Sequence, residues 1–212
     1  MITQKIKQKI MVLLAIIAIL SLSTQVNAHT LKKHHTVQHN TVQKDMANVS
    51  LKTPQERITA FVYSVQPQKG KKYAETVASY IMKYAAKNNI SPYMVATTCY
   101  IESEFRMTAS GGLGMMQISP STYRAEGYKR RGLKATQLAD NIQIGSSELA
   151  RHYKDVTSRG GYDRMAYTWG RYNGCGTHGA YVKKSMRAYK HLTTGNPSTW
   201  KEHLRTHGPL WK

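Results

Sequence analysis

The feature that most constrains this fold is the change between residues 91 and 117, where a helical pattern gives way to a glycine-rich turn. Ser91-Pro92 is typical of a helix start, because serine can cap the first turn and proline at the first helical position loses no hydrogen bond. Three glycines in the four positions from Gly111 to Gly114 then allow a sharp turn and a close approach to a ligand. The sequence therefore predicts a helix followed by a tight connection.

One carboxylic acid, Glu102, falls on the apolar side of this predicted helix. When each residue is turned by about 100° from Met94, Glu102 joins a stripe of apolar and small side chains. Glu104 falls with Tyr93, Thr97 and Tyr100 on the other side, and we expect its carboxylate to be the solvated one. Burial disfavours a charged carboxylate and raises its pKa, as a general acid requires. Glu102 is therefore the catalytic candidate, and the alternative is a boundary residue at the helix end.

Three motifs, in order, resemble the soluble lytic transglycosylase (SLT) domain family of the lysozyme-like superfamily. They are Glu-Ser-x-Phe at 102–105, Gly-Met-Met-Gln at 114–117 and Tyr-Asn-Gly at 172–174, with a further tyrosine at 181. The resemblance covers residues 73–192 and implies a mostly α, lysozyme-like fold with a single helical catalytic domain. Met115 departs from the Leu usual in the family, and Arg171 stands where Ala is common.

The resemblance also implies roles for individual side chains. Glu102 would be the catalytic acid/base, and Ser103 would help to orient it. The other implied substrate-binding residues surround the sugar cleft: Met116 and Gln117 line it, and Tyr172, Asn173 and Tyr181 close around the scissile bond. No metal and no cofactor are implied.

The implied activity is that of an exported peptidoglycan lytic transglycosylase. Such an enzyme cleaves the β-1,4 bond between N-acetylmuramic acid and N-acetylglucosamine and leaves a 1,6-anhydro sugar. One glutamic acid suffices because the C6 hydroxyl of the substrate is the nucleophile, whereas ordinary glycosidases use two carboxylates. The alternatives are a lysozyme-type hydrolase of the same fold, as in goose-type lysozymes, and a non-catalytic basic wall- or nucleic-acid-binding protein.

Charge narrows the class of partner without choosing one. The 31 Lys and Arg residues outnumber the 11 Asp and Glu residues, for a formal net charge of +20. Such a surface attracts polyanions. Because no recognisable nucleic-acid module is present, no specific nucleic acid is expected. The resemblance implies peptidoglycan glycan strands as the partner. By analogy with the family, a secretion or conjugation machine is a further candidate partner.

The first 28 residues have the layout of a secretory signal peptide. Lys5, Lys7 and Lys9 precede an apolar run over residues 10–20, and Val26-Asn27-Ala28 offers small residues for cleavage after Ala28. We therefore expect export to the periplasm or to the extracellular cell wall, with no membrane span after cleavage. An uncleaved anchor is the alternative, although the run is shorter than the roughly 20 residues that span a bilayer.

The remaining chain divides by composition. Residues 29–50 predict a disordered polar linker; it contains His29, His34, His35 and His39, but a flexible tract seldom preforms a metal site. Residues 51–72 predict an N-terminal helix and connection, 73–192 the catalytic domain and 193–212 a basic tail. Helices are expected over 53–65, 73–88, 91–105, 119–126, 136–156, 164–169, 180–192 and 198–206. Trp169 either stacks on a sugar or, as we expect, fills the core.

The two cysteines, Cys99 and Cys175, both adjoin the proposed site. In an exported protein they are candidates for a disulfide that ties the helix of Glu102 to the loop after Tyr172. Such a bond would close a long loop and stabilise the fold by about 4 kcal/mol in the chain-entropy estimate. The alternative is two reduced thiols, with Cys99 a small core residue.

Overall fold

The computed structural model describes residues 53–156, 161–196, 200 and 206. Within these ranges the chain forms helices and no sheet, with a single isolated bridge between Leu113 and Ile118. The elements are α2 (Pro54–Val65), the short 3-10 helix η1 (Pro67–Lys69), α3 (Lys71–Asn88), α4 (Pro92–Ser103), α5 (Pro120–Ala125), α6 (Leu138–Lys154), α7 (Gly161–Asn173) and α8 (Ala180–Thr194). The predicted mostly helical fold is confirmed. The predicted signal peptide, the polar linker and most of the predicted tail lie outside the described residues.

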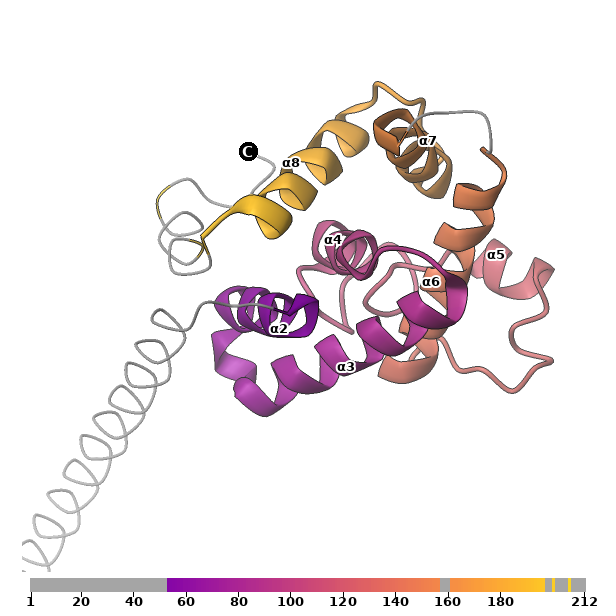
Figure 1. The fold of residues 1–212 in the computed structure, drawn as a ribbon. Coiled ribbons are helices and arrows are strands. Elements are labelled where there is room, and N and C mark those ends of the chain that lie inside the picture. The colour runs from indigo at the N-terminus through magenta and orange to yellow at the C-terminus, as the bar shows by residue number, and fades with distance from the viewer. Residues whose placement is uncertain (1–52, 157–160, 197–199, 201–205, 207–212) are drawn as a thin grey trace, which may run out of the picture. The chain divides into compact units, whose positions relative to one another are not determined.

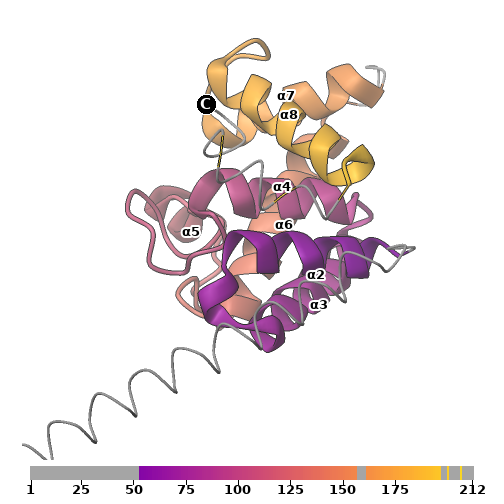
Figure 2. The ribbon, with the colours of Figure 1, turned by 90° about the vertical axis from the view of Figure 1, so that its left-hand side faces the viewer.

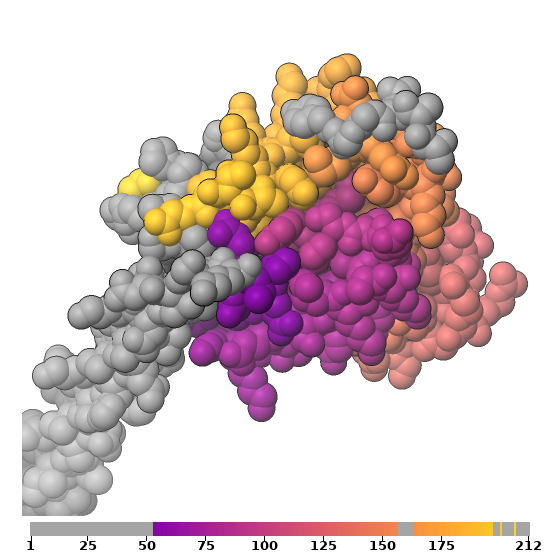
Figure 3. Space-filling view, viewed as in Figure 1, coloured from indigo at the N-terminus to yellow at the C-terminus, as the bar shows by residue number. Residues whose placement is uncertain are grey.

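Helix α4 lies in the middle of this arrangement. It packs against α8 on one side and against α2 and α3 on the other, while α6 contacts α3 and α7 (Figures 1 and 2). The space-filling view shows α7 and α8 forming the upper part of the molecule, above the layer that contains α3 and α4 (Figure 3). The helix that ends at Glu102 and Ser103 is therefore enclosed by helices from both halves of the chain.

Helix α4 is buried along most of the side that the sequence prediction assigned to Glu104. Thr97 and Tyr100, which we placed on that side, are 0% and 1% exposed, and every residue from Met94 to Tyr100 is buried. A helix covered by neighbours on all sides does not show a single apolar stripe. The burial of Glu102 thus follows from its position in the central helix rather than from a helical stripe.

Two left-handed residues end α4 and fix the position of its last turn. Glu104 and Phe105 have φ of +53° and +62°, a conformation that most side chains avoid. The carbonyl of Glu104 accepts a hydrogen bond from the Gln66 side chain at 2.8 Å, and the Tyr73 hydroxyl donates to the carbonyl of Phe105 at 2.6 Å. Two partners from other elements therefore hold the backbone directly after Glu102.

An aromatic cluster anchors the same end of α4 in the core. Phe61 of α2 packs edge-on against Tyr100 and Phe105, with ring centroids 4.9 and 5.6 Å apart, and against Trp200 at 5.2 Å. Edge-to-face pairs add to the stabilisation that burial gives. Phe105, which follows the catalytic candidate by three positions, is fully buried.

Helix α2 is fixed at its start and against α8. Thr53 and Glu56 form a reciprocal capping box, as the sequence predicts. Arg57 donates to the carbonyls of Leu192 and Gly195 at 2.9 and 2.7 Å. These carbonyls lie at the C-terminal end of α8, where a cation is favourable because the helix dipole is negative there.

The two cysteines are free in the structure, so the disulfide considered from the sequence is not formed. Cys99 is fully buried within α4, and burial raises the pKa of its thiol. Cys175 lies in the turn after α7 and is partly exposed. The reduced-thiol alternative describes the structure, with Cys99 acting as a small core residue.

In the described part of the chain, none of the helices combines the length and the apolar character needed to cross a membrane.

The close contact between α6 and the glycine-rich turn gives a stability prediction. A methyl group at Gly145 would lie 2.8 Å from Cβ of Met116 and even closer to its sulfur. We expect Gly145→Ala to lower the free energy of unfolding by about 1–3 kcal/mol, because overpacking forces side chains or backbone to shift. Chemical denaturation measures this value. Gly176→Ala is the matched control, since nothing lies within 4 Å of its added methyl group; an equal loss in both variants would contradict the prediction.

Candidate active site

The glycine-rich turn is held in shape by the side chain of Gln117. Its Oε1 accepts from the Gly112 amide at 2.7 Å, and its Nε2 donates to the carbonyls of Gly114 and Ala109 at 2.7 and 3.2 Å. Gln117 itself has a left-handed φ of +48°. The turn also requires glycine at position 112, because a Cβ atom there would lie 2.5 Å from the Gln117 carbonyl oxygen. The turn therefore closes on its own last residue.

Asn141 of α6 ties this turn to the helical core. Its side chain donates to the carbonyls of Leu113 and Ala135 at 2.8 and 2.7 Å, and accepts from the amide of Met116 at 2.8 Å. Asn141 is fully buried, so each of these bonds satisfies a polar group that water cannot reach. One side chain thus places the turn opposite the end of α4.

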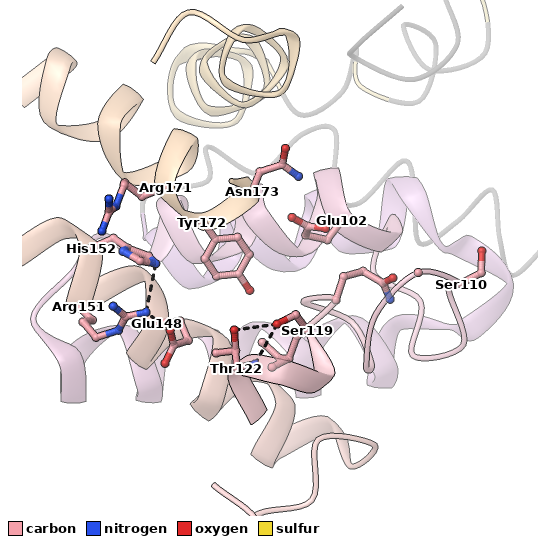
Figure 4. A pocket seen from close by; sticks show the side chains of 13 residues that line it. Glu102, Ser110, Ser119, Thr122, Glu148, Arg151, His152, Arg171, Tyr172 and Asn173 are labelled. Carbon is pink, nitrogen blue, oxygen red and sulfur yellow. Dashed lines mark hydrogen bonds and ion pairs between the residues drawn. The ribbon is translucent and has the colours of Figure 1, made fainter. Parts of the chain in front are cut away.

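A cavity of about 620 Å³ opens between these elements, with Glu102 in its wall (Figure 4). This volume is in the range of sites that take small ligands. The lining residues come from four parts of the chain: the end of α4 (Glu102), the turn and the start of α5 (Ser110, Gly111, Gln117, Ile118, Ser119 and Thr122), α6 (Glu148, Arg151 and His152) and the end of α7 (Arg171, Tyr172 and Asn173). The surface is polar, as a sugar site requires.

Glu102 is the group in this cavity with the properties of an acid. Burial raises the pKa of its carboxyl from 4.5 to about 7. Tyr181, the second residue of α8, donates its hydroxyl to Oε1 of Glu102 at 2.5 Å, and this bond acts in the opposite direction because it favours the carboxylate. A carboxyl group with a pKa near 7 can both give and take a proton at neutral pH.

Tyr172 joins the end of α7 to the glycine-rich turn. Its hydroxyl donates to the Met116 carbonyl at 2.8 Å, and burial raises its pKa well above the ordinary value. Trp169, one turn earlier, is fully buried and donates to the Thr98 hydroxyl at 3.0 Å. Trp169 is therefore a core residue, as we expected, and does not reach the cavity.

The structure brings together most of the side chains that the resemblance implied. Glu102, Gln117, Tyr172 and Asn173 line the cavity, and Tyr181 contacts the carboxyl group directly. Glu104, the other acid of the segment, pairs with Arg106 at 4.0 Å and is not in the cavity wall.

Ser103 and Met116 lie in positions that differ from those the resemblance implied. The Ser103 hydroxyl donates to the Cys99 carbonyl and accepts from the Arg106 amide, both at 3.1 Å, so it stabilises the end of α4 rather than bonding to Glu102. Met116 is fully buried against Gly145, and its main chain holds Asn141 and Tyr172. Both residues support the site from behind the cavity wall.

The sequence analysis missed the part of the site that α6 supplies. Glu148 is 4% exposed and lines the cavity beside Arg151 and His152. A signal was present, because Glu148 follows Asn141 and Gly145 at spacings of seven and three residues, which places it on the same side of the helix. An acid at such a position is a candidate for the same reason as Glu102.

Glu148 is held by two partners and does not resemble Glu102 in its surroundings. The Tyr128 hydroxyl donates to its Oε1 at 2.5 Å, and Arg151 donates to its Oε2 at 2.6 Å. Each oxygen already accepts a hydrogen bond, so this carboxylate is committed to its neighbours. Within the described ranges, no group of three or more His, Cys, Asp or Glu side chains is placed to hold a metal ion.

Comparison with known proteins agrees with this geometry. The family model described as the transglycosylase SLT domain matches residues 79–191, close to the range over which the motifs resemble that family. No curated protein and no solved structure matches the chain.

Burial of Glu102 predicts a pH-dependent stability. Between its unfolded pKa of 4.5 and its folded pKa of about 7, the unfolded chain loses the proton while the folded chain keeps it, so the wild type loses stability as pH rises. Glu102→Gln cannot ionise. It should therefore gain about 3 kcal/mol relative to the wild type on going from pH 4 to pH 8.

Denaturation curves at both pH values measure this gain. Glu75→Gln is the matched control, because its side chain is 52% exposed and, among the described residues, forms a single ion pair, with Lys71 on the surface of α3. If the stability difference between Glu102→Gln and the wild type does not change with pH, the pKa of the Glu102 carboxyl is not raised in the folded protein, and the prediction is contradicted.

Proposed function

The chain belongs to the transglycosylase SLT domain family, whose members are lytic transglycosylases that cleave peptidoglycan, and on that premise we propose that it cleaves glycan strands with Glu102 as the sole acid/base. The bond cleaved is the β-1,4 link between N-acetylmuramic acid and N-acetylglucosamine. The observation that carries the proposal is the half-buried Glu102 carboxyl, with its pKa raised to about 7, in the wall of a polar cavity.

Glu102 acts twice in the proposed reaction. Its proton first goes to the glycosidic oxygen, so the bond to C1 of the muramic sugar breaks and N-acetylglucosamine leaves with a hydroxyl group. The N-acetyl group of the substrate helps to stabilise the positive charge at C1. The Glu102 carboxylate then takes the proton of the C6 hydroxyl as that oxygen bonds to C1. The product is a 1,6-anhydro sugar, Glu102 is again protonated, and no water is consumed.

The arrangement of carboxylates supports a single acid/base. Ordinary glycosidases need a second carboxylate as nucleophile or base. In the described part of the chain, the other acid that lines the cavity is Glu148, and Tyr128 and Arg151 occupy its two oxygens. A nucleophile that belongs to the substrate removes the need for a second free carboxylate.

The remaining implied residues are assigned by their contacts. Tyr181 holds the Glu102 carboxyl in one orientation and favours its charged form in the second step. Tyr172, fixed to the Met116 carbonyl, lines the cavity, and Asn173 and Gln117 supply polar groups at its wall. Ser103 acts only indirectly, through the end of α4.

We place the enzyme outside the cytoplasm, at the cell wall. The support is the signal-peptide pattern in residues 1–28 together with a substrate that belongs to the wall. The net charge of +20 favours binding to anionic polymers there. Opening the wall for a secretion or conjugation machine is the role that analogy with the family suggests.

Mass spectrometry of the released sugars tests the proposed reaction. Incubated with purified peptidoglycan, the wild type should release anhydro-muropeptides, and Glu102→Gln should be slower by about 10²- to 10⁴-fold, the range for loss of a general acid or base. Products with reducing ends would instead identify a lysozyme-type hydrolase. Equal rates for both proteins would rule out Glu102 as the acid.

The hydrogen bond from Tyr181 predicts a shifted pH profile. The first step needs protonated Glu102, so kcat/KM of the wild type should fall as pH rises through about 7. Tyr181→Phe removes a bond that favours the carboxylate, so the pKa of Glu102 should rise and the falling limb should move to higher pH. A limb that stays in place, or moves to lower pH, would contradict this assignment.

A further inference from the structure

The cavity has a basic wall on the side where α6 faces α7. We call Glu148, Arg151, His152 and Arg171 the α6–α7 wall. Figure 4 shows Arg151, His152 and Arg171 on one side of Tyr172 and Glu102 on the other. The mechanism proposed above uses none of these four side chains, so the wall needs an explanation of its own.

Arg151 is fixed within the wall by acids. It donates to Glu148 at 2.6 Å, and this bond, together with weaker attraction from Glu126 and Asp155, raises its pKa. The Tyr128 hydroxyl orients the other oxygen of Glu148. The charge of Arg151 is therefore largely compensated by neighbours on its own side of the cavity.

His152 separates the two arginines as a neutral ring. Its Nε2 lies 3.4 Å from a nitrogen of Arg151, and a guanidinium can only donate, so Nε2 faces it as an acceptor. Burial lowers the pKa of His152, and the charges of Arg151 and Arg171 lower it further. A neutral imidazole adds no positive charge to the wall and does not neutralise the charge of Arg171.

Arg171 is the cation of the wall that has no acidic partner. No ion pair reaches it within 4.0 Å among the described residues, and its remaining contact is a distant stacking on Tyr167, 5.9 Å from its guanidinium carbon to the ring centre. Its side chain is exposed and lines the cavity beside Tyr172. An exposed guanidinium without an ion-pair partner is available to bind an anion from outside the chain. Guanidinium groups bind carboxylates through two parallel hydrogen bonds.

We propose that Arg171 is an anion subsite that binds a carboxylate group carried by the glycan strand while the bond to be cleaved lies at Glu102. This inference rests on the proposed function. Peptidoglycan carries carboxylates on the lactyl group of its muramic sugar, when no peptide is attached, and on its peptides. Arg171 then favours strands that bear such a group over neutral glycans.

Three substrates and three variants test this subsite. The substrates are peptide-bearing glycan strands, the same strands with every carboxylate converted to a neutral amide, and strands freed of peptide by an amidase so that the lactyl carboxylate is exposed. The variants are Arg171→Gln, Arg171→Lys and, as matched control, Arg187→Gln. Arg187 is also an exposed arginine without an ion-pair partner among the described residues, but it lies on α8 outside this cavity.

On peptide-bearing strands, Arg171→Gln should raise KM about three- to tenfold with kcat nearly unchanged, the modest size reflecting the exposure of the pair. Arg171→Lys should restore part of the loss, and Arg187→Gln should match the wild type. On amidated strands, the wild type and Arg171→Gln should have equal KM. An effect on peptide-bearing strands must come from a peptide carboxylate, because the lactyl carboxyl is then in an amide bond, and it should be lost on amidase-treated strands. An effect seen only on amidase-treated strands would identify the lactyl carboxylate instead.

Binding to the same strands, measured with Glu102→Gln alone and combined with Arg171→Gln, needs no turnover. The ratio of the two dissociation constants should shrink as salt is raised. An Arg171→Gln effect that is the same on amidated strands, or no larger than that of Arg187→Gln, would overturn the subsite. Absence of cleavage by the wild type would count against the proposed function alone, because the binding ratio still tests Arg171.

Discussion

The site depends on one interaction, the hydrogen bond that Tyr181 donates to the half-buried carboxyl of Glu102. Burial alone would keep the carboxyl protonated, whereas the tyrosine hydroxyl stabilises the charged form. The balance leaves a pKa of about 7, which allows one group to act as acid and then as base. The bond also joins α4 to the start of α8, residues far apart in the chain, so the chemistry requires the whole helical fold.

The opposite wall of the cavity is positioned by side chains that bond to the main chain of the glycine-rich turn. Asn141 fixes the glycine-rich turn to α6, and Tyr172 fixes the end of α7 to the same turn through the Met116 carbonyl. Gly145 allows Met116 to pack directly on α6. Because each contact is buried or half-buried, a change at any of them should displace the cavity wall without touching the acid.

The sequence predicted the parts of the fold that local patterns encode. Val77, Ile81, Tyr84 and Ala85 of α3 are buried on one side as their spacing indicates, and the capping box of α2 is present. The all-round burial of α4 was not predictable from its own residues, because it results from helices on both sides. For the same reason the motif around Met116 predicted a cleft residue where tertiary packing buries the side chain. Glu148 was missed because Tyr128, which lies outside α6, contacts it only in the folded chain, although Arg151 is its neighbour on the same helix.

The central claim, that the fold holds the Glu102 carboxyl at a pKa near neutrality, can be measured directly. Carbon-13 NMR of side-chain carboxyl groups, with Glu102→Gln used to assign the resonance, follows the titration of this residue in the intact folded protein. The account predicts a midpoint at about pH 7, as burial against α8 requires. A midpoint near 4.5, the value of an unperturbed glutamic acid, would contradict it.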